Sequence, residues 1–167
     1  MISGASHTGK TALAHKLLKK YSIPYLSIDH LKMGLIRSGQ TPLTPEDDEE
    51  LVPYLWSIVK EIVKTAVENR QDLIIEGCYI PFDWRDSFDE AYLSDIRCVW
   101  LIMSEDYIRR NFGDIKKYAN VIENRLDDGW LTPEALIRDN AENLAGCIKH
   151  GCEYVTISDI YSPDIVL

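Results

Sequence analysis

The stretch Gly4-Ala5-Ser6-His7-Thr8-Gly9-Lys10-Thr11 fits the pattern G-x-x-x-x-G-K-[ST], and the rest of the sequence is interpreted outward from it. Glycines at both ends of this stretch let the backbone turn so that successive N–H groups point at one anion. The helix that begins near Lys10 directs the positive end of its dipole at the same place. The pattern therefore predicts a phosphate-binding loop. Its alternative is a glycine-rich turn that binds nothing.

The polar residues of the loop have defined tasks if the anion is a nucleoside triphosphate. Lys10 reaches the β- and γ-phosphates in such a loop, and the Thr11 hydroxyl binds Mg²⁺. The sequence has no Asn-Lys-x-Asp pattern for guanine, which favours ATP over GTP. We therefore expect ATP and Mg²⁺ as cofactors. The expected cofactor-binding residues are Gly4, Ala5, Ser6, His7, Thr8, Gly9, Lys10, Thr11 and Ala12.

Short apolar runs alternate with segments of helical spacing along the chain. Strands are expected at residue 2 and at 24–28, 73–75, 96–103 and 154–157. Helices are expected at 10–20, 30–38, 84–92 and after Ser104, with Gly113 interrupting the last of these. Continuous apolar strands joined by connections of helical length predict a parallel sheet covered by helices on both faces. We expect an α/β fold in one domain, residues 1–167.

One helix-start signal, a threonine followed by proline and glutamate, occurs twice. Thr44 is expected to cap a long amphipathic helix with Pro45 in its first position, and Pro53 marks a site for a kink. Thr132 is expected to cap a second helix that runs to about Lys149. Each of the two signals therefore predicts where a helix begins.

Composition and charge exclude some classes of function. The 167 residues carry a net charge of −9, which repels nucleic acid, and no apolar run approaches the roughly 20 residues of a membrane helix. The first residues, Met-Ile-Ser-Gly, have no signal-peptide pattern. We expect a cytoplasmic protein, a monomer or homodimer, whose partner is a small-molecule acceptor rather than nucleic acid or a membrane.

The four cysteines form no C-x-x-C pair, and a cytosolic domain of this size needs no disulfide. Cys147, His150 and Cys152 have a spacing that would suit zinc. The alternative is a helix that ends at Gly151, followed by a buried strand. This alternative is favoured, because a structural zinc site needs a fourth ligand.

Three segments together resemble the P-loop small-molecule and nucleotide kinases: Gly4–Thr11, Ser27-Ile28-Asp29 and Leu73-Ile74-Ile75-Glu76-Gly77. The resemblance covers most of the chain. It is nearest to the group of chloramphenicol phosphotransferase, zeta toxins and 2-phosphoglycerate kinase, and adenylate kinase is more distant. It implies a three-layer fold with a five-stranded parallel sheet in the order 2-3-1-4-5. It also implies a small helical lid after the fourth strand, at about residues 108–131.

The two acidic residues at expected strand ends are candidates for chemistry. Asp29 is similar in placement to the proposed base for the acceptor hydroxyl, and it could equally hold a Mg²⁺-bound water. Its structural alternative is the cap of the helix at 30–38. Glu76 takes the place of the second acidic element of P-loop proteins and would bind acceptor or Mg²⁺ through water. Alternatively, Glu76 is a buried acid paired with arginine.

Further residues are assigned through the resemblance. The acceptor would be held by residues after the second and third strands, with Arg37 as an anion clamp. The lid would supply a guanidinium to the transferred phosphoryl group, with Arg110 and Arg109 ranked above Arg125. The loop at 158–163 would pack on adenine. The expected acceptor residues are Arg37, Glu76, Tyr79 and Arg85, and Asp83 and Trp84 lie beside them.

The function that these residues favour is an ATP- and Mg²⁺-dependent kinase acting on a small hydroxylated or phosphorylated molecule. Lys10, Asp29, Arg109 and Arg110 would be its catalytic residues, and Thr11 and Glu76 its metal-binding residues. One alternative is a P-loop NTPase that transfers the phosphoryl group to water and acts as a switch. Another is a nucleotide-binding protein without catalysis, although Lys10, Thr11 and Asp29 are all present.

Overall fold

Five parallel strands form one sheet in the order β2-β3-β1-β4-β5. The structure is a computed structural model that describes residues 1–118, 131–161, 163 and 165. This strand order is the expected one, so the predicted α/β fold is confirmed. The strands are β1 (Ile2–Gly4), β2 (Tyr25–Ser27), β3 (Ile74–Glu76), β4 (Val99–Met103) and β5 (Glu153–Ile157).

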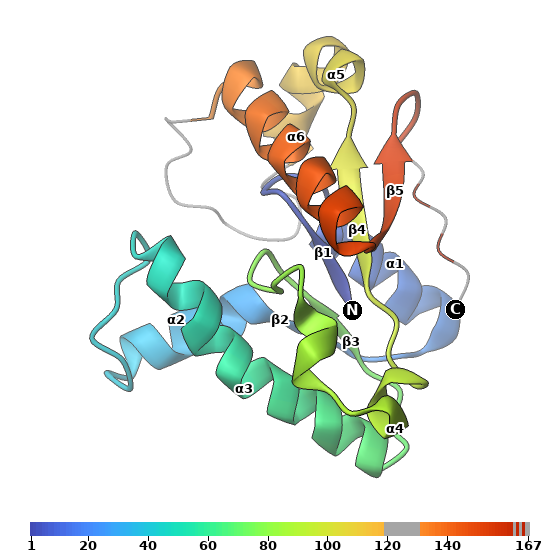
Figure 1. Ribbon diagram of the computed structural model, residues 1–167. Helices are drawn as coiled ribbons and strands as arrows, with labels where there is room; N and C mark the ends of the chain where they lie inside the picture. Colours follow the sequence, from blue (N-terminus) through green and yellow to red (C-terminus); the bar gives the residue numbers. More distant parts are fainter. Residues whose placement is uncertain (119–130, 162, 164, 166–167) are drawn as a thin grey trace.

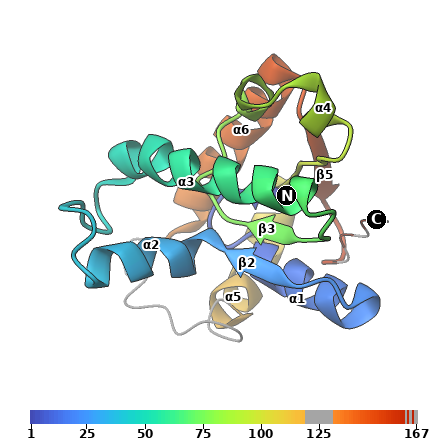
Figure 2. The ribbon, with the colours of Figure 1, turned by 90° about the horizontal axis from the view of Figure 1, so that it is seen from below.

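Helices cover both faces of this sheet, which gives the molecule three layers (Figures 1 and 2). One layer holds α1 (Lys10–Tyr21) and α5 (Glu105–Tyr118). The opposite layer holds α3 (Asp48–Glu68) and α6 (Pro133–His150), with the short α4 (Glu90–Leu93) beside them. The helix α2 (Ile28–Arg37) follows β2 directly and contacts α3. Nowhere in the described part of the chain is a helix both long and apolar enough to cross a membrane.

The strand β4 shows why the sheet needs cover on both faces. All five of its side chains are buried, and they alternate between two separate cores. Trp100 and Ile102 pack into the core that includes α3, whereas Leu101 and Met103 pack into the core that includes α1 and α5. Successive side chains of a strand point to opposite faces, so an uninterrupted apolar run requires a layer on each side.

Two helix boundaries differ from the sequence-based expectation. The strand β2 ends at Ser27, and Ile28 already belongs to α2, so Asp29 lies in the first turn of that helix. The alternative role of Asp29 as the helix cap is therefore wrong, because Ser27 occupies the cap position. Thr44 also caps no helix. The α3 helix begins at Asp48, because the Thr44 N–H and O–H both donate to the Asp47 carboxylate at 2.7 and 2.9 Å.

Two further segments depart from expectation. The helix expected at 84–92 is instead a 3-10 helix, η1 (Trp84–Ser87), followed by α4. The α5 helix runs through Gly113 without interruption. A side chain at Gly113 would meet open space, so this glycine serves no close approach. A glycine inside a helix lowers its stability but does not end it when the apolar face is packed.

The α6 helix is tied to the sheet by a buried amide. Thr132 caps it as expected, with its hydroxyl oxygen accepting from the Ala135 N–H at 3.1 Å. Further along the helix, Asn140 Oδ1 accepts from the Met103 N–H and Nδ2 donates to the Leu136 carbonyl, both at 2.8 Å. The side chain is 1% exposed, so these bonds replace water that cannot reach it. Asn140 thus fixes α6 against the end of β4.

Replacing Asn140 with leucine should lower the free energy of unfolding by about 1–3 kcal/mol, because the Met103 N–H would be left buried without an acceptor. Urea denaturation followed by circular dichroism measures this change. Asn143→Leu is the matched control, since Asn143 also donates to a carbonyl of its own helix, that of Asp139, but is only partly buried. Equal losses in the two variants would contradict this account of Asn140.

Candidate functional site

The predicted phosphate-binding loop leaves the carboxyl end of β1, the central strand of the sheet. Three of its residues have positive φ angles: Gly4 at 136°, His7 at 66° and Gly9 at 80°. A Cβ atom at Gly4 would collide with the Leu101 carbonyl of β4. The left-handed His7 is uncommon for a residue with a side chain, and such backbone is often found where N–H groups gather around an anion. These backbone angles are compatible with the predicted phosphate cradle.

Lys10 begins α1 and its side chain folds back over the loop. Its ammonium group donates to the carbonyls of Gly4 at 3.1 Å and Ala5 at 2.8 Å. The residue is only 5% exposed, so its charge is held at the loop rather than in solvent. Thr8 closes the same turn by donating its hydroxyl to the Ala5 carbonyl at 2.9 Å. These bonds hold the buried Lys10 ammonium against the backbone of the predicted loop.

Thr11 and Glu76 meet directly, as both metal-site assignments require. The Thr11 hydroxyl donates to Glu76 Oε1 at 3.1 Å, which joins α1 to the end of β3. Glu76 is 1% exposed and pairs in register with Ser27 of β2 and Ile2 of β1. Burial raises the pKa of Glu76, and the Ser27 hydroxyl, the Lys10 ammonium and the Thr11 hydroxyl act against this rise. No arginine of the described ranges 1–118 and 131–161 pairs with this carboxylate, so the alternative of an arginine pair has no support there.

The residues around Glu76 suit Mg²⁺. Glu76 Oε2 is buried without a hydrogen-bond partner among the described residues. Mg²⁺ prefers oxygen ligands and keeps several of its waters, so a carboxylate beside a threonine hydroxyl can hold the ion through water. Thr11 would supply a direct ligand and Glu76 would accept from bound water. An unpartnered buried oxygen is otherwise costly, and a hydrated ion would satisfy it.

A second polar group lies at the start of α2 and contains Asp29. Lys32 Nζ contacts Asp29 Oδ1 at 3.2 Å and donates to the Tyr79 hydroxyl at 2.7 Å. Tyr79 in turn donates to Asp48 Oδ1 at 2.9 Å, at the first turn of α3. Burial raises the pKa of Tyr79, and so do its bond to Asp48 and the nearby Asp29 charge. The Asp29 charge also raises the pKa of Glu76, so Asp29 acts on both the metal-suited carboxylate and Tyr79.

Lys32 was missed in the sequence analysis although it is central to this group. Its side chain is 13% exposed and its ammonium lies 4.9 Å from the Tyr79 ring centroid. The only local signal was its position three residues after Asp29, where side chains of a helix are neighbours. Its other partner is 47 residues away along the chain.

Two predicted acceptor residues are not brought to this group. Arg37 lies exposed in the last turn of α2, roughly 12 Å along the helix axis from Asp29. Arg85 stacks on Trp84 and contacts the Gly151 carbonyl, just before β5 begins. That contact is at the amino edge of the parallel sheet, whereas the predicted phosphate-binding loop is at the carboxyl edge. Arg85 is therefore placed away from the other candidates, and Asp83 and buried Trp84 lie next to it in the chain.

The predicted lid arginines make contacts away from the loop. Arg109 pairs with Glu105 and Glu134, and Arg110 donates to the Ser158 carbonyl at 2.6 Å. The segment expected as lid is α5 up to residue 118, with Ile108 and Ile115 buried in the core. Residues 119–130, including Arg125, lie outside the described residues. The catalytic role of a lid arginine stays a prediction.

Tyr161 lies after β5, in the segment 158–163 that was expected to pack on adenine. Its hydroxyl donates to the carbonyl of Gly9 in the predicted phosphate-binding loop at 2.7 Å. No local pattern signals this contact, because 152 positions separate the two residues. The segment expected to pack on adenine thus contacts the loop itself.

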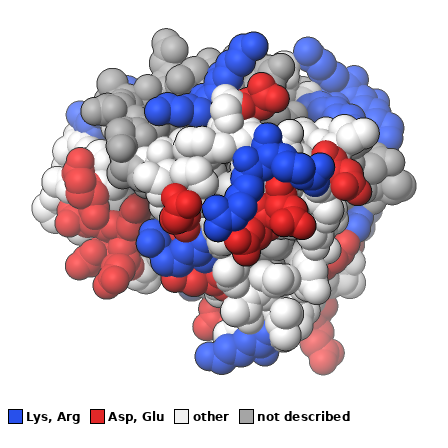
Figure 3. Space-filling view, turned by 90° about the horizontal axis from the view of Figure 1, so that it is seen from above, with Lys and Arg blue, Asp and Glu red and all other residues white. Residues whose placement is uncertain are grey.

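The carboxyl edge of the sheet carries charges of both signs (Figure 3). Basic side chains lie near the middle of this face and acidic side chains lie next to them. More acidic side chains gather on the left of the view, the side on which Figure 1 draws α2 and the start of α3. Asp48, Glu49 and Glu50 form the first turn of α3. The candidate site is therefore bordered by an acidic flank.

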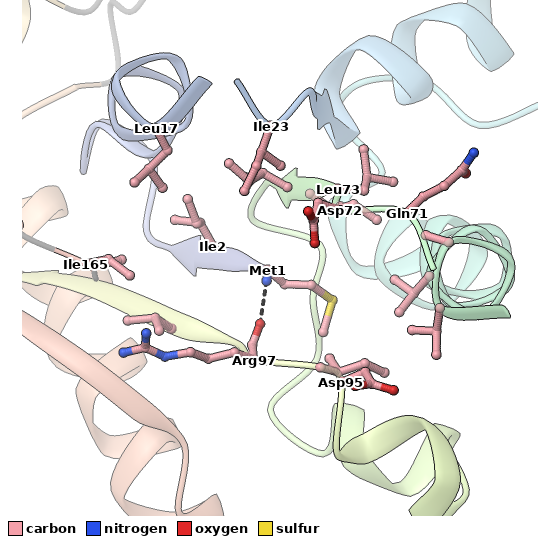
Figure 4. A pocket seen from close by; sticks show the side chains of 17 residues that line it. Met1, Ile2, Leu17, Ile23, Gln71, Asp72, Leu73, Asp95, Arg97 and Ile165 are labelled. Atoms are coloured by element: carbon pink, nitrogen blue, oxygen red, sulfur yellow. Dashed lines mark hydrogen bonds between the residues drawn. The ribbon is translucent and has the colours of Figure 1, made fainter. Parts of the chain in front are cut away.

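A pocket of about 230 Å³ opens at the opposite edge of the sheet (Figure 4). Met1, Leu73 and Arg97, which precede β1, β3 and β4, are among its lining residues. None of the predicted site residues lines it. Phosphate-binding loops and acceptor groups follow the carboxyl ends of parallel strands, so this pocket is not the candidate site.

The zinc alternative finds no support in the described residues. Cys147 and Cys152 are buried free thiols at the end of α6 and the start of β5. The helix ends at Gly151 in the left-handed conformation, as the structural alternative predicted. No group of three or more metal-binding side chains occurs within residues 1–118 and 131–161.

Comparison with solved structures identifies proteins with the same fold. A protein of Chloroflexus aurantiacus assigned as a kinase matches with a TM-score of 0.56 and 18% identity, covering 99% of this chain and 89% of that one. A gluconokinase of Sinorhizobium meliloti matches with a TM-score of 0.51 and 16% identity, covering 97% and 82%. No protein-family model and no curated protein sequence matches the chain. At such identities the likeness establishes the fold, and this chain has the fold of these kinases.

Proposed function

We propose that this protein is an ATP- and Mg²⁺-dependent phosphotransferase that transfers the γ-phosphate to a small hydroxylated or phosphorylated acceptor. The observation that carries the proposal is the contact of Thr11 with the buried Glu76, which lies near Lys10. The second oxygen of Glu76 has no hydrogen-bond partner within the part of the chain that the structure describes. Asp29 lies near the same carboxylate. A phosphate cradle, a metal-suited carboxylate and a candidate base are thus adjacent at one edge of the sheet.

The residues divide the reaction between them. The loop N–H groups and Lys10 would hold the nucleotide phosphates and offset the charge that spreads over the γ-phosphoryl oxygens. Thr11 and Glu76 would hold Mg²⁺, which would supply positive charge to offset the negative charge of the nucleotide phosphates. Asp29 would orient the acceptor hydroxyl and accept its proton. The acceptor oxygen then bonds to the γ-phosphorus as the bond to the bridging oxygen of ADP breaks.

Lys32 and Tyr79 support Asp29 in this scheme. The ammonium of Lys32 keeps the Asp29 carboxylate in place, and the one-way chain from Lys32 through Tyr79 to Asp48 fixes the ammonium. The acceptor would therefore lie between the start of α2, the residues after β3 and the start of α3. The resemblance to the group of chloramphenicol phosphotransferase, zeta toxins and 2-phosphoglycerate kinase stays a prediction within this proposal.

Acceptor-dependent ADP release tests the proposal. We expect a library of polyols, nucleosides, nucleotides and phosphorylated acids to contain compounds that stimulate ADP release with Mg²⁺ and ATP. ATP hydrolysis without any acceptor effect would instead indicate a switch, and ATP binding without turnover would indicate a non-catalytic protein. Lys10→Ala should weaken ATP binding and abolish transfer, because a buried cation at the phosphates is lost. Full activity of that variant would refute the assignment of the loop.

Asp29→Asn should keep ATP binding but lower the rate of phosphoryl transfer by at least about tenfold. A positioned base contributes on the order of 10²–10⁴-fold, and the amide has similar shape without basicity. Steady-state kinetics with the best acceptor, together with calorimetric ATP binding, would measure both effects. Asp95→Asn is the matched control, since Asp95 lines the pocket at the opposite edge. Undiminished turnover in the Asp29 variant would remove its catalytic role.

Glu76→Gln should stabilise the metal-free protein at neutral pH while lowering Mg²⁺-dependent activity. The pKa of Glu76 is raised by burial, so the folded state binds its proton more tightly than the unfolded chain does. Ionised Glu76 therefore destabilises the fold above its ordinary pKa of 4.5, and an uncharged amide would not. In EDTA at pH 7.5, thermal unfolding should give the variant a higher melting temperature than the wild-type protein.

The advantage of the Glu76 variant should shrink as the pH falls toward and below 4.5, because the folded state takes up the proton first and the unfolded chain follows below its ordinary pKa. Adding Mg²⁺ should stabilise the wild-type protein more than the variant, because the ion offsets the buried charge. A variant that is less stable than the wild type in EDTA at pH 7.5 would contradict the interpretation that the buried charge of Glu76 destabilises the metal-free fold.

A further inference from the structure

Tyr161 joins the segment after β5 to the phosphate-binding loop. Its hydroxyl donates to the Gly9 carbonyl at 2.7 Å, and its ring covers the α-carbon of Gly9 so closely that a Cβ atom there would collide with it. The ring also packs against the apolar core beneath α1 and α5. Burial raises the pKa of Tyr161, so the hydroxyl remains a neutral donor at physiological pH.

The Gly9 carbonyl belongs to the same peptide plane as the Lys10 N–H. This plane is rigid, and its carbonyl and N–H point in opposite directions. The carbonyl accepts from Tyr161 at 2.7 Å and from the Leu13 N–H at 2.9 Å. Two donors therefore set the angle of the plane, and this angle determines where the Lys10 N–H points. As the first residue of α1, Lys10 has an N–H without an intrahelical acceptor, and it is available to an anion.

The segment that carries Tyr161 is also held at its other end. Arg110 of α5 donates to the Ser158 carbonyl at 2.6 Å and lies 3.7 Å from the Asp159 carboxylate. Both charged side chains are exposed, at 57% and 89%, so this ion pair contributes little stability. The partly buried phenol of Tyr161 is the attachment that reaches the Gly9 carbonyl itself.

We infer that Tyr161 is a positioning residue of the phosphate cradle, which keeps the Gly9–Lys10 peptide aimed at the nucleotide phosphates. The inference rests on the proposed function for the loop as the phosphate site. A residue that packs on adenine would affect binding through the base. Tyr161 would instead affect the binding of the phosphates. Through the peptide plane, Tyr161 affects any polyphosphate, whether or not a base is attached.

Tyr161→Phe tests this inference, because it removes the hydroxyl and keeps the ring in its place. The dissociation constants of Mg-ATP and of inorganic tripolyphosphate with Mg²⁺ would be measured by calorimetry. Both should rise by about three- to tenfold, which is the effect expected from the loss of one hydrogen bond. In the acceptor-dependent assay, KM for ATP should rise and KM for the acceptor should not change. Tyr154→Phe, on the partly exposed β5, is the matched control.

Three results would overturn the inference. Weaker binding of ATP with unchanged binding of tripolyphosphate would assign Tyr161 to the base instead. A lower melting temperature with both dissociation constants unchanged would make the residue purely structural. Unchanged binding and unchanged stability would remove any role. If the wild-type protein binds neither compound, the proposed function fails as well, whereas wild-type binding with an indifferent Tyr161→Phe variant overturns this inference alone.

Discussion

A buried carboxylate is the constraint on which the arrangement of the site depends. Glu76 lies at the end of β3, in register with β1 and β2, and accepts from Thr11 at the start of α1. Four elements thus converge on one acidic group whose charge is unfavourable where it lies. Natural sequences keep buried acidic groups at an energetic cost mainly at functional sites. The unfavourable charge at Glu76 is what an incoming cation would relieve.

The alternation of strands and helices could be predicted from the sequence because it depends on local patterns, as does the prediction of a phosphate-binding loop. The order of the strands in the sheet came only from the resemblance to the P-loop kinases. The glycines, Lys10 and Thr11 lie within eight consecutive residues. Each run of apolar residues likewise predicts a buried strand without information from the rest of the chain. The contacts of Lys32 with Tyr79 and of Tyr161 with Gly9 could not be predicted, since they join residues 47 and 152 positions apart. Only the fold decides which polar side chains meet across such distances.

The two threonine–proline signals show how a single acceptor decides a helix boundary. At Thr132 the hydroxyl oxygen accepts from the N–H three residues later, so the helix begins at once. At Thr44 the residue three positions later is Asp47, whose carboxylate accepts from Thr44 itself. That reversed pair closes a turn before α3 can begin. The aspartate was visible in the sequence, but the direction of the hydrogen bond depends on which oxygen competes better for the donor.

Hydrogen-bond direction also limits what the acceptor side of the site can recognise under the proposed function. Lys32 can only donate, so the Tyr79 oxygen accepts from it and the Tyr79 proton goes to Asp48. The chain therefore runs one way. Asp29, which meets Lys32 through Oδ1, retains further lone pairs on its carboxylate. A ligand group that brings a proton can bond to that carboxylate, whereas a carbonyl oxygen would be repelled, and this asymmetry favours a hydroxyl as the group that receives the phosphate.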